Sequence, residues 1–573
     1  MKNRTYYKSS FLIALFIVFT GTLGFAQNRY VATTGTDAGD CSSPGSPCNT
    51  ITYAISQAVA GDVINVDDGT YNENVNLNKD NLTLRSNNGK SVTTIEGTFG
   101  GGTGSVMVAN GTNGVTIGLS GHGFTIIGFD GNGAIEAAAV YLLGAHTNIT
   151  IEGNEIRANG DHGLLSNFNA AINGIMIRDN MFTGQTFVGA EPGGCGFATQ
   201  FDPGNNVPRQ LVTMGGGAGV TMSMNVSFLN NMVTGTAGGF NLEPACAAFG
   251  QGNNLVTIDV IGLEVKGNIF NGTTTRFSNN LRARGPGASI SCNTFYNNGL
   301  GAACGHIFFG SATPLTGASP NTLAGIAENN AFPEGGAYLT PDNAGSYVIY
   351  RDVAQADAAA TSIGAGQTSV AAATSINCPV QNLNTGELFQ TIQSAINDAQ
   401  TAGGHTISVA AGSYNEDVLA NKAVTLLGAG CDVTTISGPM GGDGATVRIS
   451  APGVVVDGFM ITRDGNNVVD WNDGTLNFAG VAVQGQTVFG EIRNCKITGN
   501  RSGIDVNNSN GNNIHNNVIT NNHTGLIFRN QTDNTLLNEN EITDNRTVGV
   551  LFLDASGGTN TPVQTAANRS FKN

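Results

Sequence analysis

One opening module occurs twice in this chain, and the two copies lie 341 positions apart. The shift is the same from Thr50 to Thr391 (391 − 50 = 341) and from Thr93 to Thr434 (434 − 93 = 341). Each copy also contains the motif Gly-x-Tyr-x-Glu, ending at Glu73 in the first and at Glu416 in the second. A repeat over this distance indicates two folding units of one kind, and it must be recognised before local motifs are interpreted.

A short amphipathic helix is predicted at the start of each copy. Apolar residues recur at i, i+3, i+4 and i+7, which is the pattern of one buried helical face. Thr50 and Thr391 precede the first turn and are expected to cap it. Short β-branched alternations follow, so we expect each helix to close the open end of a stack of strands. The apolar positions are Ile51, Ala54, Ile55, Ala58 and Val59 in the first copy and Ile392, Ala395, Ile396 and Ala399 in the second.

A shorter repeat predicts the strands themselves. Ile497, Ile519 and Ile542 occupy equivalent places in Asn-rich segments that recur every 22 and 23 residues (519 − 497, 542 − 519). A period of this length is typical of one solenoid coil of about three short strands, with coils about 4.8 Å apart. Asn suits the sharp corners because it tolerates left-handed backbone, and stacked Asn side chains can form ladders. Looser copies in the first half centre on Ile156, Phe182, Val233, Phe270 and Phe295.

These repeats divide the chain into two solenoid units. Residues 28–351 form the first unit, with long loops, and residues 379–573 form the second. Residues 352–378 are rich in Ala, Thr and Ser and lose the pattern, which predicts a linker. The second unit breaks off in the middle of a coil, which favours further domains of the same polypeptide after Asn573 or a partner at that end.

The N-terminus predicts export. Residues 1–26 combine basic residues, a short apolar run and a small-x-small cleavage site, as in a secretory signal peptide; an uncleaved anchor is the alternative. The apolar run is too short to span a bilayer, and no later stretch predicts a membrane span. The net charge of −16, with 25 Lys and Arg, argues against nucleic acid and anionic membranes as partners. We therefore expect a secreted or cell-surface protein.

Nine cysteines in an exported chain predict disulfides and one remaining thiol. No Cys or His spacing is typical of a zinc site. The pairs favoured by closeness along the chain are Cys41–Cys48, Cys292–Cys304 and Cys195–Cys246, while Cys378, Cys431 and Cys495 are left unassigned.

The coil pattern resembles the right-handed parallel β-helix proteins of the pectate-lyase-like superfamily over nearly all of the mature chain. The opening of the second half, Phe389-x-Thr391-Ile392-Gln393-x-Ala395-Ile396 with Gly412-x-Tyr414-x-Glu416, is also similar to the start of pectinesterases. The pectinesterase catalytic blocks Gln-Asp-Thr-Leu and Gly-Arg-Pro-Trp do not occur in the sequence, so esterase activity is not expected. The tandem arrangement is similar to secreted β-helix proteins of bacterial surfaces. The resemblance implies an all-β fold and a bacterial origin.

The same fold hosts both binding proteins and enzymes, so a polysaccharide lyase or a glycoside hydrolase is the alternative function. A lyase of this kind needs an acidic calcium site and an Arg or Lys that can take a proton. Arg282 and Arg284 form the densest basic segment, but no acidic cluster lies near them in the sequence. Asp161 and His162 place an imidazole beside an acid, which suits proton transfer, although a turn is the simpler interpretation. The catalytic residues therefore remain unassigned.

The loop that follows Gly458-Phe-Met-Ile461 predicts ligand binding. It holds the only Trp of the chain, and an exposed Trp can stack on a sugar ring while polar groups fix the hydroxyls. Bound Ca²⁺ at three of its acids is one alternative, and a solvated turn whose Trp covers the solenoid wall is another. No cofactor is required for ligand binding, and Ca²⁺ is the alternative. The residues predicted to contact a ligand are Arg463, Asp464, Asp470, Trp471 and Asp473, with Asp464, Asp470 and Asp473 as the calcium alternative.

Together these features favour an exported, adhesin-like β-helix scaffold that binds a polysaccharide or a cell-surface glycan along one face. The alternatives differ in geometry. Acids and a base that converge on adjacent coils favour an enzyme, whereas a face covered by Asn and Thr favours binding alone.

Overall fold

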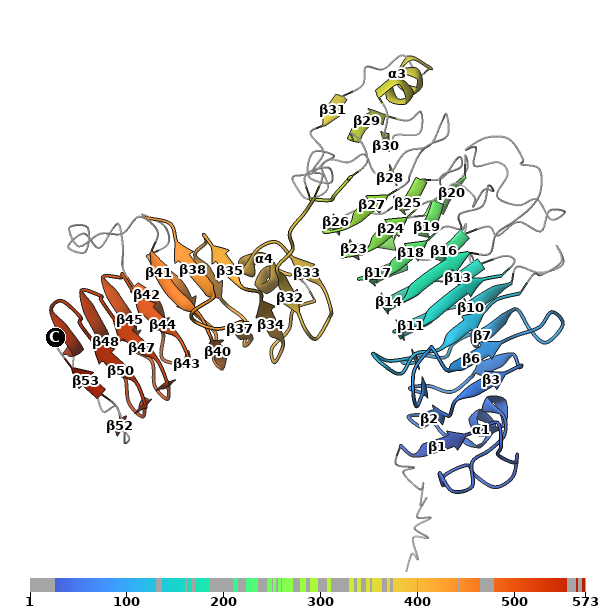
Figure 1. Cartoon of the computed structure of the whole chain (residues 1–573), viewed down its shortest axis with the longest axis horizontal. Helices are drawn as coiled ribbons and strands as arrows, with labels where there is room; N and C mark the ends of the chain where they lie inside the picture. The colour runs from blue at the N-terminus through green and yellow to red at the C-terminus, as the bar shows by residue number, and fades with distance from the viewer. Residues whose placement is uncertain are drawn as a thin grey trace, which may run out of the picture.

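The computed structural model contains two β-helices, each built from three parallel sheets (Figure 1). The first ends near β28 and the second begins near β32, and their long axes meet at an angle rather than in one line. The structure describes residues 26–571, except 130–136, 160–161, 167–170, 185–209, 215–222, 235–244, 250, 254–255, 259, 272–278, 285–288, 297–306, 311–328, 334–336, 342–346, 351–352, 363–367, 371–374, 399, 441–443, 464–478, 554–562 and 565–568.

The first β-helix consists of sheets A1, B1 and C1, which each coil visits in that order. Sheet A1 contains β1 (Asn28–Val31), β2 (Val63–Val66), β5 (Thr83–Ser86), β8 (Thr116–Ile117), β11 (His146–Glu152), β14 (Ile172–Arg178), β17 (Ser223–Leu229), β23 (Glu264–Lys266) and β26 (Ser289–Ser291), with β22 (Val260–Ile261) beside β17. Sheet B1 contains β3 (Gly69–Tyr71), β6 (Thr93–Glu96), β9 (Thr125–Ile127), β12 (Glu155–Ala158), β15 (Met181–Gly184), β18 (Met232–Thr234), β24 (Ile269–Asn271) and β27 (Thr294–Tyr296). Sheet C1 contains β4 (Val75–Leu77), β7 (Gly104–Val108), β10 (Ala138–Leu142), β13 (His162–Ser166), β16 (Gln210–Met214), β19 (Ala245–Phe249), β25 (Asn279–Arg284) and β28 (Ile307–Gly310).

The second β-helix repeats this arrangement in sheets A2, B2 and C2, except that β32 pairs antiparallel with both β33 and β34 at the start of sheet A2. Sheet A2 contains β33 (Leu388–Phe389), β32 (Val380–Asn382), β34 (Thr406–Val409), β37 (Thr425–Gly428), β40 (Val454–Asp457), β43 (Gly490–Arg493), β46 (Asn513–His515), β49 (Leu536–Asn538) and β52 (Val563–Gln564). Sheet B2 contains β35 (Gly412–Tyr414), β38 (Thr434–Gly438), β41 (Met460–Arg463), β44 (Lys496–Thr498), β47 (Val518–Thr520), β50 (Glu541–Thr543) and β53 (Arg569–Phe571). Sheet C2 contains β36 (Val418–Ala420), β39 (Ala445–Ile449), β42 (Ala479–Gln484), β45 (Ser502–Asn507), β48 (Thr524–Arg529) and β51 (Val548–Leu553).

The predicted all-β, parallel β-helix fold is confirmed by this strand pairing. Residues of the same period meet across the coils: Ile497 pairs with Ile519, and Ile519 with Ile542. All three side chains point inward and are buried. Each β-helix has its own apolar core, so neither depends on the other for its interior.

A stack of phenylalanine rings fills the C-terminal coils of the first core. Neighbouring rings have centroids 5.0 to 6.3 Å apart, within the range in which aromatic pairs attract each other beyond their area of contact. The stacked residues are Phe182, Phe228, Phe270, Phe295 and Phe332.

The two predicted capping helices are α1 (Ile51–Gln57) and α4 (Ile392–Asn397), and their inward side chains are buried. Thr50 and Thr391 are the N-caps, as expected from the sequence. One part of the prediction is wrong. Val59 is 45% exposed, because the backbone leaves the helix at Ala58 with an extended ψ of 157°.

The Gly-x-Tyr-x-Glu motif holds these helices in place. The two carboxylate oxygens of Glu73 accept hydrogen bonds from the backbone N–H groups of Ile51 and Thr52, both at 2.8 Å. Glu416 accepts from Ile392 and Gln393 in the same way, both at 2.9 Å. An acid at this position satisfies donors that a helix N-terminus leaves unpaired and faces the positive end of the helix dipole. The motif that is similar to pectinesterases is therefore structural in this chain.

Asparagine corners between sheets A1 and B1 form a buried ladder. Each ladder residue donates through Nδ2 to the Oδ1 of the next one, at 2.9 to 3.2 Å. The preceding residue has left-handed backbone; φ is 56° at Asp179 and 52° at Asn230. The predicted ladders are thus present. The first contains Asn154, Asn180, Asn231, Asn268, Asn293 and Asn330, and shorter ones join Asn517 to Asn540 and Asn500 to Asn522 and Asn545.

The segment 352–378, predicted to be a linker, includes a helix and a strand. Helix α3 (Val353–Ser362) is alanine-rich, and alanine has the highest helix propensity. Strand β31 (Thr368–Val370) pairs antiparallel with β29 (Ala337–Pro341), which pairs with β30 (Tyr347–Tyr350) beside β28. Another antiparallel pair joins β20 (Gln251–Asn253) and β21 (Val256–Ile258).

The disulfides confirm one predicted pair and correct another. Cys41 is bonded to Cys48, as expected. Cys292 is bonded to Cys378 and not to Cys304, because the start of the second β-helix returns to the first and brings Cys378 beside the corner at Cys292. Cys431 and Cys495 are both free thiols, so the expectation of one remaining thiol is wrong. Cys195 lies outside the described residues.

Candidate functional site

The predicted ligand loop lies between β41 and β42, and residues 464–478 are outside the described part of the chain. The assignments to Asp464, Asp470, Trp471 and Asp473, with their calcium alternative, therefore stay predictions. Arg463 is the one predicted contact residue that the structure describes. Its side chain is buried, and Nη1 donates to Asp417 Oδ1 at 2.8 Å and to the carbonyl of Pro439 at 2.6 Å. Arg463 thus anchors the base of the loop.

The structure does not bring the predicted catalytic residues that it describes close to one another. Arg282 and Arg284 lie on β25 and His162 lies on β13, where it is buried, while Asp161 is outside the described residues. Both strands belong to sheet C1, but β16 and β19 separate them. Three strand spacings amount to about 14 Å, which is too far for direct proton transfer between these groups.

A row of polar side chains crosses the outer face of sheet A2. Asp457 pairs in register with Arg493, Arg493 with His515, and His515 with Asn538. These four residues, which we call the A2 polar row, come from the successive strands β40, β43, β46 and β49. They alternate with the inward residues Val456, Ile492, Ile514 and Leu537.

Hydrogen bonds fix the side chains of the row. Arg493 Nε donates to Asp457 Oδ2 at 2.8 Å, and Nη1 donates to Glu491 Oε1 at 2.7 Å. Glu491 Oε1 also lies 2.9 Å from Nε2 of His515. The exposed corner residues Asn494 and Asn516 extend the network: Asn494 Nδ2 donates to Asp457 Oδ1, and Asn516 Nδ2 donates to Glu539 Oε2.

The network is partly exposed to solvent, so the pKa values of its groups reflect both partial burial and hydrogen bonds. The side chain of Arg493 is 34% exposed, that of Glu491 28% and that of His515 21%. Partial burial acts to raise the pKa of Glu491, but hydrogen bonds from His515 and Arg493 outweigh it, so the pKa lies below its usual value. Hydrogen bonds to Asp457 and Glu491 raise the pKa of Arg493. Glu491 and Arg493 therefore stay charged at neutral pH.

The sequence repeat already carried the signal for this row. Arg493, His515 and Asn538 are spaced by 22 and 23 residues (515 − 493, 538 − 515), the same period as the apolar anchors. Each follows the inward residue of its strand. Because the period was used only to locate the core, the outward column beside it was missed.

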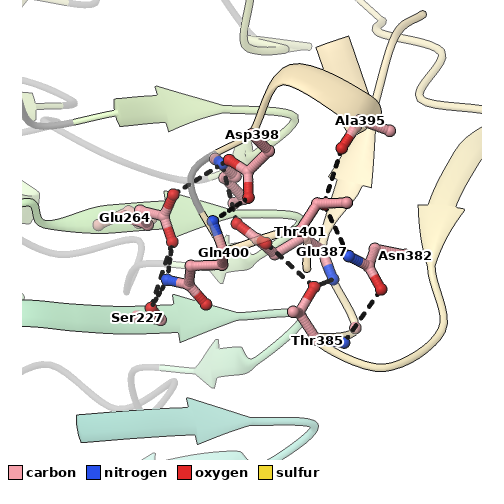
Figure 2. A network of polar contacts seen from close by, with 12 residues as sticks. Ser227, Glu264, Asn382, Thr385, Glu387, Ala395, Asp398, Gln400 and Thr401 are labelled. Carbon is pink, nitrogen blue, oxygen red and sulfur yellow. Dashed lines mark hydrogen bonds and ion pairs between the residues drawn. The ribbon is translucent and has the colours of Figure 1, made fainter. Parts of the chain in front are cut away.

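A second polar cluster joins the two β-helices (Figure 2). Lys266 on β23 places its Nζ 3.1 Å from Glu264 Oε1, 2.8 Å from Glu387 Oε1 and 3.0 Å from Asp398 Oδ1. Glu387 precedes β33 and Asp398 is the C-cap of α4, so two of the three acids come from the second β-helix. We call these four residues the joint cluster. Lys266, Glu387 and Asp398 have side chains no more than 8% exposed, and that of Glu264 is 12% exposed.

Further contacts surround the joint cluster. Gln400 Nε2 donates to both Ser227 Oγ and Glu264 Oε2 (Figure 2). Arg178 Nη1 donates to the carbonyl of Asn384 at 2.9 Å, and Asn230 Nδ2 donates to that of Gly386. With the Cys292–Cys378 disulfide, these bonds fix the opening segment of the second β-helix against sheet A1.

Three carboxylates that approach one another within 4.8 Å have the composition of a cation site. Here Lys266 Nζ contacts all three and supplies the positive charge itself. Burial disfavours its charge, yet the acids raise the pKa of Lys266 above its usual value. The cluster is therefore an ionic joint between domains. The first opening module has no equivalent, because Ser46 and Gln57 stand where Glu387 and Asp398 are found 341 positions later.

The known proteins that this chain is similar to differ from one another in function. The family model described as "Periplasmic copper-binding protein (NosD)" matches residues 430–564, all within the second β-helix. A cell surface glycoprotein of Methanothermus fervidus is 37% identical over 89 residues, which is 16% of this chain and 14% of that protein. The chain thus corresponds to a small part of that relative.

Among solved structures, a pectin methylesterase from carrot is 13% identical over 55% of this chain and 82% of its own, with a TM-score of 0.30. The pectate lyase Pel9A is also 13% identical, over 55% of this chain and 76% of its own, with a TM-score of 0.32. The fold assignment itself rests on the strand pairing described above. Within the described residues, no helix is long and apolar enough to cross a membrane.

Proposed function

We propose that this protein is an exported, surface-associated scaffold of two rigidly joined β-helices, and that it binds a polysaccharide or glycan along the outer face of sheet A2. The signal-like residues 1–26 support export, and the stretch similar to a cell surface glycoprotein supports a place at the cell surface. The joint cluster and the Cys292–Cys378 disulfide support a scaffold, because they fix two rods at one angle.

The observation that carries the binding proposal is the A2 polar row. A linear polysaccharide presents similar hydroxyl groups at each sugar along its length. The row presents hydrogen-bonding groups once per coil, about 4.8 Å apart, so a periodic ligand meets a periodic surface. Because Asp457, Glu491 and His515 are held by Arg493 and by one another, little side-chain freedom is lost on binding.

The predicted loop extends this proposal. It leaves sheet B2 after Arg463, in the same β-helix as the row. Trp471 supplies the aromatic platform that sugar rings favour, and the polar row lacks such a group. Asp464, Asp470 and Asp473 would then fix sugar hydroxyls or Ca²⁺.

One observation favours the enzymatic alternative. Glu491 orients the imidazole of His515 by a 2.9 Å contact, and a carboxylate that orients a histidine is a recurrent arrangement for proton transfer. A polysaccharide lyase or hydrolase would use His515 as its base, with Arg493 against the charge that develops on the substrate. In the proposed binding protein the same groups only donate and accept hydrogen bonds.

The experiment that tests the proposal is titration of the full chain with pectin, alginate and neutral glycans by calorimetry. We expect binding to at least one polymer, at least tenfold weaker in Arg493→Ala and His515→Ala. Thr520→Ala, on the outer face of sheet B2, is the matched control and should bind like the wild type. Trp471→Ala tests the loop. Row variants that bind like the wild type, or a panel without any ligand, would overturn the proposal. Release of unsaturated products or reducing ends would favour the enzyme.

A further inference from the structure

The joint cluster contains more acidic than basic side chains. Three carboxylates, Glu264, Glu387 and Asp398, surround the single ammonium of Lys266. Three other basic groups lie nearby and bond elsewhere: Arg178 pairs with Glu152 and donates to the carbonyl of Asn384. Lys422 donates to the main-chain carbonyl of Asp398, and His405 contacts Asn382 through Nδ1. Full ionisation would leave two unmatched negative charges in a buried interface, and unmatched buried charge is costly.

A single proton on Glu387 halves this imbalance, from two unmatched negative charges to one. Burial raises the pKa of Glu387 to about 8, although Lys266 opposes the shift. Burial acts in the same direction on Asp398, but Lys266 and a hydrogen bond with Glu387 lower its pKa below the usual value. Glu387 therefore holds the proton at neutral pH, and its carboxyl group lies within 4.8 Å of that of Asp398. The second oxygen of Glu387 accepts from Thr385 Oγ1 at 3.0 Å, so the carboxyl group is satisfied on both sides.

We infer that the joint is a proton-controlled latch, closed while Glu387 holds a proton and released when that proton is lost. The geometry supports an effect on the joint alone. Each β-helix has a separate apolar core, and the cluster lies between them. The Cys292–Cys378 disulfide keeps the two parts tethered, so release changes their angle and not their connection.

The direction of the pH dependence follows from the state of the joint in which Glu387 holds its proton. The pKa of Glu387 is raised in the closed joint, so protonation favours closure. That contribution is complete at acidic pH, weakens above the usual carboxyl range, and is gone once the pH passes about 8. An exported protein would therefore present its two rods at a fixed angle in neutral or mildly acidic surroundings and at a variable angle in alkaline ones.

The test is small-angle X-ray scattering of the full chain, with its disulfides intact, at pH 6.5 and pH 9.5. We expect the maximum dimension of the wild type to change between the two, while Glu387→Gln, which keeps the donor but cannot ionise, retains the pH 6.5 dimension at both. Glu491→Gln removes an acid far from the joint and should respond like the wild type. An unchanged wild type, or an equal change in Glu387→Gln, would overturn the inference.

A second measurement covers the case in which Glu387→Gln does not fold. Amide hydrogen exchange of the wild type, corrected for the intrinsic effect of pH, should accelerate selectively at residues 384–398 above pH 8. Residues 502–507 of sheet C2 serve as the internal reference. Equal protection of both segments at pH 6.5 and 9.5 would contradict the latch.

Discussion

Lys266 Nζ lies 2.8 Å from Glu387 Oε1, although 121 positions separate the two residues and each belongs to a different β-helix. The contact is buried, and Lys266 also lies 5.0 Å from the ring centroid of Phe389. A cation in this position interacts with the electron-rich face of the ring as well as with the acids. One ammonium group therefore contributes to the relative orientation of the two rods, together with the disulfide and the hydrogen bonds around the cluster.

Replacing Lys266 by Met tests that dependence. The variant leaves three buried acids without their counter-ion, and breaking a buried ion pair from one side costs about 3–5 kcal/mol. We expect faster amide exchange at residues 384–398 and a lower temperature for the first thermal transition. Lys496→Met on the outer face of β44 is the control, and an equal effect there would contradict the special role of Lys266.

The same contact shows why the sequence predicts each rod but not how the rods join. The spacing of Ile497, Ile519 and Ile542 follows the coil period, so each of them could be assigned to the core from the repeat alone. Lys266 and Glu387 follow no common period, because their contact depends on how two finished β-helices meet. The Cys292–Cys378 bond escaped prediction for the same reason, since closeness along the chain favoured Cys304.

Short sequence motifs predicted the features whose physical cause lies within a few residues. Thr391 caps its helix through bonds within one turn, so its neighbours in the sequence are sufficient to predict it. The outer face of sheet A2 is a different case. Nothing about Arg493 or His515 in isolation distinguishes a binding row from a solvated surface. Their spacing of one coil period and their register on adjacent strands place them in one column.

Glu73→Ala should weaken the cap on the first β-helix. The substitution removes a charged acceptor from two backbone N–H groups at the start of α1, and bonds of this kind contribute about 1.5–3 kcal/mol. We expect a lower midpoint of urea unfolding for the first β-helix. Glu155→Ala, which removes a carboxylate paired with the half-exposed Arg157, should cost at most about 1 kcal/mol. Equal losses would contradict a capping role for Glu73.

Asn231→Ala should disrupt the ladder at its centre. Asn231 Nδ2 donates to the carbonyl of Ile177 at 2.9 Å, and its Oδ1 accepts from the backbone of Asn180 at 3.0 Å. Removal leaves buried groups unpaired on neighbouring coils, at about 1–3 kcal/mol for each. Asn516→Ala changes an exposed corner residue and should cost less. The measurement is the midpoint of urea unfolding of both variants. Equal midpoints would contradict a stabilising role for the ladder.

Phe270→Ala tests whether stability is transmitted along the rod. The ring is fully buried, with centroids 6.3 Å from Phe228 and 5.0 Å from Phe295, and its loss from a core of this kind costs about 3–5 kcal/mol. In a solenoid each coil is stabilised mainly by its nearest neighbours, so the loss should remain local. We expect hydrogen exchange to accelerate in β17, β24 and β26, while β2 and β5 keep their protection. Phe489→Ala, at a residue 43% exposed in the second β-helix, should leave all of these strands unchanged. Uniform acceleration from β2 to β26 would instead mean that the first β-helix unfolds as one cooperative unit, and the nearest-neighbour account of its stability would be wrong.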